Sequence, residues 1–137
     1  YAHDELRDEA LQRVMVEGQV PCLCITEPTG GSDATAMKTP ATINDRGEWV
    51  INGQKAWCSF GAIGGIFLVF AVTDPEERKS RRLSAFLVDA KSPGLRVGRN
   101  EKKIGLRGIR VRECHSSAIA YGWRAWTRLV GCNALAE

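Results

Sequence analysis

Apolar residues near the start of the chain recur at a helical spacing. Between positions 4 and 17 they fall three and four residues apart and form one stripe, made up of Leu6, Ala10, Leu11, Val14 and Met15. Acidic residues fill the first turns, where the helix dipole favours negative charge, and Gly18 supplies a stop before Pro21. Glu9 and Arg13 have the spacing of a helical ion pair. We therefore predict one amphipathic helix over residues 4–17, whose apolar stripe needs another surface to cover.

From Cys22 onward the pattern changes to short apolar runs separated by turn residues. After a first strand that ends near Pro28, the runs predict strands at residues 41–45, 49–52, 55–60, 66–73, 83–89 and 95–98. Arg46-Gly47 predicts a two-residue hairpin turn, and Gly53-Gln54 separates the strand at 49–52 from the next one. Short strands with regular turn signals are typical of an antiparallel barrel or sandwich. We expect a mainly β fold, an antiparallel β-barrel or sandwich preceded by one helix.

The stretch from Leu23 to Asp33 combines a strand end with a glycine-rich turn. Pro28 ends the strand because proline cannot donate to a sheet ladder. The two glycines at 30–31 let the backbone approach a bulky ligand, and Ser32 with Asp33 suits the cap of a short helical turn. This arrangement is suited to a polar ligand that carries a phosphate. A plain surface turn explains the same pattern equally well.

The length of 137 residues predicts one domain with a substantial core, and the net charge of +3 is mild. The charge is uneven, because the stretch from Arg96 to Arg112 holds seven basic residues and only Glu101 as an acid. Such a stretch attracts anions, and a phosphorylated cofactor fits it as well as nucleic acid does. The longest apolar run, residues 66–72, is too short to span a bilayer.

Five cysteines stand at positions 22, 24, 58, 114 and 132, without a Cys-x-x-Cys pair. Cys22 and Cys24 share one face of a strand, and Leu23 and Ile25 take the other. We predict buried, reduced thiols in a cytosol-like compartment and no metal site. The chain shows no signal peptide, and because it begins at Tyr1 we expect it to be a piece of a longer protein.

Residues 114–137 carry weaker signals than the rest of the chain. Trp123 and Trp126 lie three apart among several alanines, which predicts a helix within residues 118–135. The segment has neither strand alternation nor good helix caps. Three explanations of this tail remain open: a divergent end, an artificial end of the sequence and a shifted reading frame.

Several motifs together carry a family resemblance. Residues 26–33 (TEPTGGSD), 51–59 (INGQKAWCS), 83–88 (LSAFLV), 93–95 (PGL) and 103–107 (KIGLR) resemble the acyl-CoA dehydrogenase family in order and spacing. The resemblance implies a flavoprotein with an N-terminal helical domain, a central β-barrel domain and a C-terminal helical bundle. Residues 1–20 would then be the last helix of the first domain, residues 21–113 the central domain that binds FAD and acyl-CoA, and residues 114–137 the tail.

The resemblance also implies cofactor-binding residues in two segments. They are Leu23, Ile25, Thr26, Ser32, Trp57, Cys58 and Ser59. The first three match positions that bond the polar edge of the isoalloxazine ring, and Ser32 matches a serine at the cofactor phosphate and the acyl-CoA substrate. Trp57 matches an aromatic beside the ring, and Ser59 a hydroxyl that donates to flavin N5. Glu27 matches a structural position rather than a catalytic base.

The implied activity is α,β-dehydrogenation of acyl-CoA thioesters, with hydride transfer to flavin N5. The family's catalytic glutamate lies in the C-terminal domain, so we expect no catalytic residue in this chain and no activity from it alone. Expected partners of the parent protein are acyl-CoA, electron-transfer flavoprotein and further copies of itself, in the bacterial cytoplasm or the mitochondrial matrix. Ser59 stands where threonine is common, and Phe60 replaces a usual asparagine.

Other functions remain open at this stage. An acyl-CoA oxidase or a flavin monooxygenase would share the central domain and differ in chemistry. A nucleic-acid-binding module would use residues 96–112, but no aromatic residue interleaves those charges. A non-catalytic fragment is the third alternative.

Overall fold

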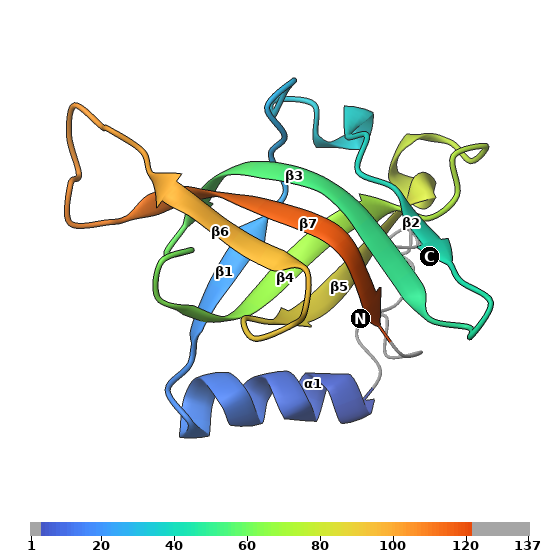
Figure 1. Ribbon diagram of the computed structural model, residues 1–137, viewed down its shortest axis with the longest axis horizontal. Coiled ribbons are helices and arrows are strands. Elements are labelled where there is room, and N and C mark those ends of the chain that lie inside the picture. The colour runs from blue at the N-terminus through green and yellow to red at the C-terminus, as the bar shows by residue number, and fades with distance from the viewer. Residues whose placement is uncertain (1–3, 122–137) are drawn as a thin grey trace, which may run out of the picture.

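The computed structural model describes residues 4–121, which form two β-sheets and one N-terminal helix (Figure 1). The first sheet has the order β1-β4-β5, from β1 (Val20–Cys24), β4 (Gly64–Val72) and β5 (Leu83–Asp89). Strands β4 and β5 pair antiparallel, whereas β1 pairs with β4 in parallel. The prediction of a mainly β fold is confirmed, and the parallel pair departs from the expected all-antiparallel arrangement.

The second sheet has the order β2-β3-β7-β6, and all its pairs are antiparallel. Its strands are β2 (Ala41–Ile43), β3 (Trp49–Ser59), β6 (Leu95–Asn100) and β7 (Val111–Tyr121). The predicted break at Gly53-Gln54 is wrong, because β3 runs through it and the pairing with β7 shifts register there instead. A Cβ on Gly53 would lie 2.5 Å from the Thr39 hydroxyl, so the glycine serves close packing rather than a turn.

The hairpin between β2 and β3 is longer than the predicted two-residue turn. The Gly47 amide donates to the Asn44 carbonyl and the Asn44 amide to the Glu48 carbonyl, both at 2.9 Å. Gly47 has a φ of 77°, as the prediction required of a glycine here. The Asn44 side chain accepts from the amides of Arg46 and Glu48, which holds a five-residue connection over positions 44–48.

The inner faces of the two sheets enclose one core. Its largest fully buried side chains include Phe67 and Phe86 from the first sheet and Ile51 from the second. Trp49 meets Phe86 edge to face, with ring centroids 5.7 Å apart. Within the described residues, the ladders leave two separate sheets rather than one closed barrel.

Single main-chain hydrogen bonds join the two sheets at their margins. The Val72 amide of β4 donates to the Thr39 carbonyl at 2.8 Å, and the Asn52 amide of β3 donates to the Pro40 carbonyl at 3.2 Å. The Ala56 amide of β3 donates to the carbonyl of Thr26, just after β1, at 2.8 Å. These bonds hold the end of β1 against β3, where the candidate site lies.

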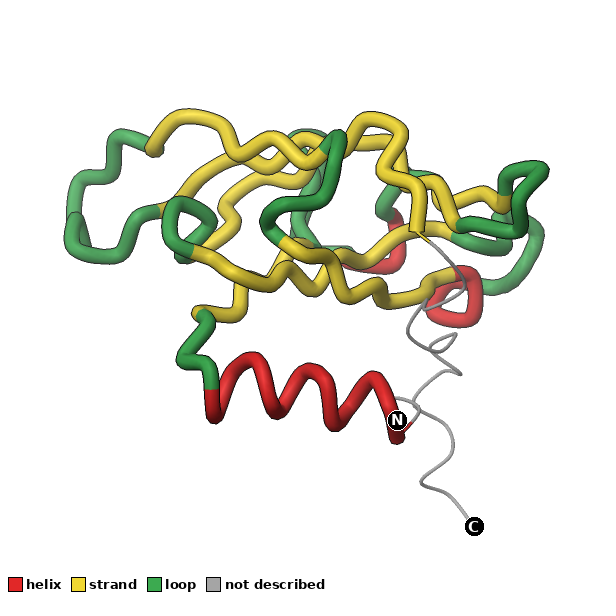
Figure 2. Tube along the Cα trace, turned by 60° about the horizontal axis from the view of Figure 1, so that its bottom comes forward, coloured by secondary structure: helices red, strands yellow, loops and turns green. Residues whose placement is uncertain are grey.

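The predicted helix is present as α1 (Asp4–Leu11), continued by a π-helical turn, η1 (Gln12–Val16), beneath the sheets (Figure 2). Gly18 follows with a φ of 68°, consistent with its predicted role as a stop. Of the apolar stripe, Leu6 is buried, while Leu11 and Met15 are exposed.

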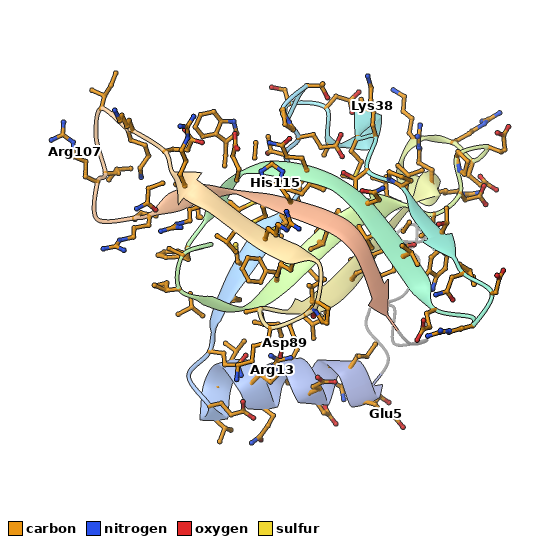
Figure 3. The ribbon with its side chains drawn as sticks, in the orientation of Figure 1. Glu5, Arg13, Lys38, Asp89, Arg107 and His115 are labelled. Carbon is orange, nitrogen blue, oxygen red and sulfur yellow. The ribbon has the colours of Figure 1, made fainter. Side chains whose placement is uncertain are left out.

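Arg13 holds this helix against the first sheet. Its guanidinium pairs with Asp89 at the end of β5 (Figure 3) and donates to the Gly65 carbonyl at 3.3 Å. The predicted pair with Glu9 is also present, at 3.7 Å. Neither α1 nor any other helix in the described part of the chain has the length and apolar character needed to cross a membrane.

Strand β7 corrects the prediction for the end of the chain. It continues past residue 113 to Tyr121, paired with β3 on one side and β6 on the other. The prediction of a helix from residue 118 is therefore wrong for residues 118–121. The rest of that predicted helix lies outside the described residues. The long pairing outweighs the weak local strand signal.

Candidate functional site

A pocket of about 540 Å³ opens where the end of β1 meets the end of β3. Its lining comprises Pro21, Leu23, Ile25, Thr26, Gly31, Ala34, Ala56, Trp57, Ser59 and Phe60. Five of the seven residues predicted to bind the cofactor are among them, contributed by segments about thirty positions apart in the sequence. The structure thus brings the two predicted segments together at one cavity.

Strand β1 presents opposite faces to the core and to this pocket. Cys22 and Cys24 are buried, while Leu23 between them is 53% exposed and lines the pocket. The alternation of a strand explains this arrangement, since successive side chains point to opposite faces. The apolar Leu23 therefore contributes surface to a cavity rather than to the core.

The turn after β1 is tight and places a glycine against the pocket. Glu27 and Gly30 exchange backbone hydrogen bonds, each of 3.1 Å, around Pro28 and Thr29. A Cβ on the neighbouring Gly31 would lie 2.8 Å from the Thr26 methyl group, so a larger residue would displace the Thr26 side chain from the pocket wall. Asp33 caps the 3₁₀ helix η2 (Ala34–Ala36) by accepting from the Thr35 amide, as predicted.

A buried ion pair lies behind this turn. The Lys55 ammonium is 2.9 Å from a Glu27 carboxylate oxygen and 3.2 Å from the Ile25 carbonyl. Glu27 also accepts from the amides of Lys38 and Thr39 and from the Thr39 hydroxyl. All these contacts are internal, consistent with the structural role predicted for Glu27.

The two charges shift in the directions that their surroundings dictate. Burial acts to raise the pKa of Glu27, but hydrogen bonds from Thr39, Lys38 and Lys55 outweigh it and lower the pKa to about 2. Burial lowers the pKa of Lys55, and the Glu27 carboxylate opposes that shift. Glu27 is therefore a carboxylate at neutral pH and a poor proton acceptor.

The end of β3 carries the exposed aromatic face of the pocket. Trp57 is 60% exposed and has a φ of 59°, and Phe60 just beyond the strand has a φ of 63°. Positive φ is costly for bulky residues and is concentrated at functional sites. Ser59 lies between these two aromatics in the chain and also lines the pocket.

Two predicted cofactor residues lie elsewhere. The Cys58 side chain is fully buried, because strand alternation turns it to the core between Trp57 and Ser59, so it cannot contact a ligand in the pocket. Ser32 is exposed and absent from the lining, which its neighbour Gly31 joins instead. Four lining residues were not predicted: Pro21, Ala34, Ala56 and Phe60. Each lies within two positions of a predicted site residue, and this was the signal in the sequence that could have indicated them.

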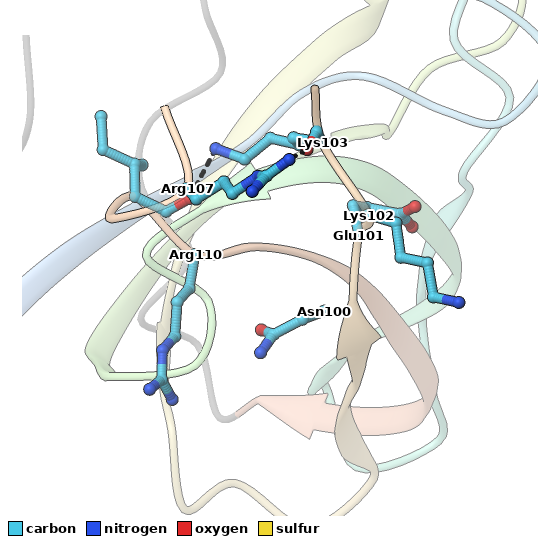
Figure 4. Close-up of a pocket in the computed structure, with 7 residues that line it drawn as sticks. Asn100, Glu101, Lys102, Lys103, Arg107 and Arg110 are labelled. Atoms are coloured by element: carbon cyan, nitrogen blue, oxygen red, sulfur yellow. Dashed lines mark hydrogen bonds between the residues drawn. The ribbon is translucent and has the colours of Figure 1, made fainter. Parts of the chain in front are cut away.

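A second cavity, of about 470 Å³, lies in the basic loop after β6 (Figure 4). Lys102, Lys103, Arg107 and Arg110 line it. Lys103 donates to the carbonyls of Leu106 and Ile109, so part of this charge stabilises the loop itself. The predicted cationic patch is present and is separate from the lining of the first pocket.

Residues 22–118 match the sequence model described as "Acyl-CoA dehydrogenase, middle domain", which is more than half of the chain. The chain belongs to the acyl-CoA dehydrogenase family. The match spans β1 to β7 and so covers both segments that form the first pocket. The family predicted from the motifs is confirmed.

Individual members of the family support the same assignment. Cyclohex-1-ene-1-carbonyl-CoA dehydrogenase from Geobacter metallireducens is 44% identical over 105 residues, which are 76% of this chain and 27% of the relative. Butyryl-CoA dehydrogenase from Megasphaera elsdenii superposes with a TM-score of 0.83 at 28% identity, covering 91% of this chain and 33% of that one.

A further solved structure contains the reduced cofactor. Glutaryl-CoA dehydrogenase from Mycobacterium smegmatis, in complex with FADH2, has a TM-score of 0.80 and 28% identity, over 92% of this chain and 31% of that one. This chain therefore spans about a quarter to a third of the length of the acyl-CoA dehydrogenases it matches.

Proposed function

We propose that the pocket between β1 and β3 binds the isoalloxazine ring of FAD. The observation that carries the proposal is the convergence of Thr26 and the turn after β1 with Trp57 and Ser59 of β3 at one cavity. Its volume of about 540 Å³ lies in the range of small-molecule sites, and its wall combines apolar and aromatic side chains with a few polar groups. The membership of the acyl-CoA dehydrogenase family supports this choice of ligand.

Each side of the pocket has a task in this proposal. The Thr26 carbonyl accepts a hydrogen bond from the Ala56 amide, so the Thr26 hydroxyl rather than the carbonyl would meet the polar edge of the ring. Trp57 would pack against the ring and exclude water, and the Ser59 hydroxyl would donate to flavin N5. Ser32, next to Gly31 at the margin of the pocket, remains our candidate for the cofactor phosphate and the acyl-CoA substrate.

The parent protein is, on this proposal, an acyl-CoA dehydrogenase. Bound FAD would supply the hydride acceptor for α,β-dehydrogenation of an acyl-CoA thioester. This chain would orient the ring and shield it, while the proton-abstracting glutamate would come from outside residues 1–137. Four features remain predictions: a closed β-barrel, electron-transfer flavoprotein as the acceptor, a homo-oligomer, and a location in the bacterial cytoplasm or the mitochondrial matrix.

Flavin content tests the proposal. We expect the full-length protein that contains this chain to be purified with, or to take up, one FAD per subunit. Trp57→Ala should weaken FAD binding at least about tenfold, because it removes the exposed aromatic surface of the pocket. Thr42→Val, an exposed position on β2, is the matched control and should bind FAD normally.

Two results would overturn the assignment. Full-length protein that takes up no FAD would remove the proposed function altogether. Undiminished FAD binding by the Trp57 variant would place the flavin elsewhere. Rapid reaction of the reduced flavin with oxygen would favour the oxidase or monooxygenase alternatives within the same fold.

A further inference from the structure

Four of the five cysteines lie together in the core. None of them lines the proposed FAD pocket. Cys22 and Cys24 come from β1, Cys58 from β3 and Cys114 from β7. All four belong to one buried cluster and are free thiols, with exposed fractions of 0–4%. The cluster therefore draws on both sheets.

The sulfur atoms are close enough to share a ligand. The Sγ atoms of Cys24, Cys58 and Cys114 all lie within 4.8 Å of one another. Cys24 reaches them from the first sheet, while the register shift in β3 between Lys55 and Cys58 brings Cys58 close to Cys114 on the second. Cys22 lies two residues before Cys24 on β1 and belongs to the same buried cluster.

We propose that Cys24, Cys58 and Cys114, with Cys22 as the fourth ligand, form a structural site for one zinc ion. A zinc–sulfur bond is about 2.3 Å, which puts the sulfurs of a tetrahedral site about 3.8 Å apart. The three mutual distances of at most 4.8 Å need to close by about 1 Å or less. Each thiol would release its proton to water as its sulfur bonds the metal.

The site would add a link between the two sheets to the main-chain hydrogen bonds and side-chain packing that already join them. Because the cysteines are buried, we expect the ion to bind during folding rather than to enter the finished core.

Refolding with zinc tests the site. The full 137-residue chain with Cys132→Ser would be refolded under reducing conditions with one equivalent of Zn²⁺, with Co²⁺, or with chelator. We expect one zinc per chain by native mass spectrometry and a rise in Tm of at least about 5 °C over the chelated sample. Cobalt should show the thiolate-to-metal absorption of a tetrahedral site.

The site is located by variants that remove sulfur. Cys24→Ala and Cys114→Ala should each lose the metal and the rise in Tm, whereas Cys132→Ser alone should keep both. Zinc retained by both alanine variants would overturn the proposal. Folding of the Cys132→Ser chain without uptake of zinc or cobalt would overturn it too. The zinc content of the Cys132→Ser chain still tests the site if an alanine variant fails to fold.

Discussion

Two ion pairs join distant segments of this chain, and their surroundings differ. The Lys55 and Glu27 side chains are only 3% and 7% exposed, and further hydrogen bonds surround their ion pair. The Arg13 and Asp89 side chains are 14% and 42% exposed, and their ion pair joins the N-terminal helix to β5. A buried charge without its partner is costly, whereas an exposed one is solvated by water. Loss of one partner should therefore cost much stability in the first pair and little in the second.

Removal of one buried charge should have the largest effect. Lys55→Met leaves Glu27 buried without its cation and should lower the free energy of unfolding by about 3–5 kcal/mol, measured by urea denaturation. Lys38→Met, at an exposed side chain, should change it by less than about 0.5 kcal/mol. The double variant Glu27→Gln/Lys55→Met should recover much of the loss. A cost below about 1 kcal/mol for Lys55→Met would show that the buried pair contributes little to stability.

Acid should weaken the same region next. The pKa of Glu27 is lowered from 4.5 to about 2 in the folded chain, so the unfolded state binds the proton more readily. Its stabilisation is fully present above about pH 4.5 and is lost as pH falls towards 2, by about 3 kcal/mol in total.

Denaturation across this range of pH measures the loss. Glu27→Gln should reduce the loss of unfolding free energy as the pH falls. Glu76→Gln, on an exposed loop, should leave this pH dependence as it is in the unsubstituted chain. An unchanged slope in Glu27→Gln would assign the acid sensitivity to other carboxylates.

A side chain added against Thr39, whose hydroxyl bonds Glu27, should have an intermediate effect on stability. Gly53→Ala places a Cβ 2.5 Å from the Thr39 hydroxyl, which also bonds Glu27, so it should cost about 1–3 kcal/mol by thermal or urea unfolding. Gly30→Ala is the control, because an added Cβ there meets no atom within 4 Å. Equal behaviour of the two variants would mean that Thr39 moves aside without loss.

The exposed pair should give the smallest effect. Asp89→Asn should lower the free energy of unfolding by about 0.5–1 kcal/mol, with a difference that shrinks at high salt. Asp8→Asn, which removes a partner of Arg7 whose side chain is 67% exposed, should have almost no effect. A loss from Asp89→Asn as large as that from Lys55→Met would erase the contrast between the two pairs.

Local signals predicted much of the fold. The strand at residues 83–89 was predicted with the bounds that β5 has, because a continuous apolar run between charged turns has few other structures open to it. Gly53 misled the reasoning, since a glycine that permits close packing looks the same in sequence as one that ends a strand. No strand was predicted at residues 111–121, where β7 lies, because its stability comes from its two neighbouring strands.

The sequence by itself determined the family, the mainly β class and most of the residues at the candidate pocket, through motifs and local periodicity. Only the tertiary structure decided which faces those residues present. Register and bulges between distant strands turn Trp57 outward and Cys58 inward, and bring Cys24, Cys58 and Cys114 together from three strands. Such pairings depend on contacts between positions far apart in the chain, which no local pattern encodes.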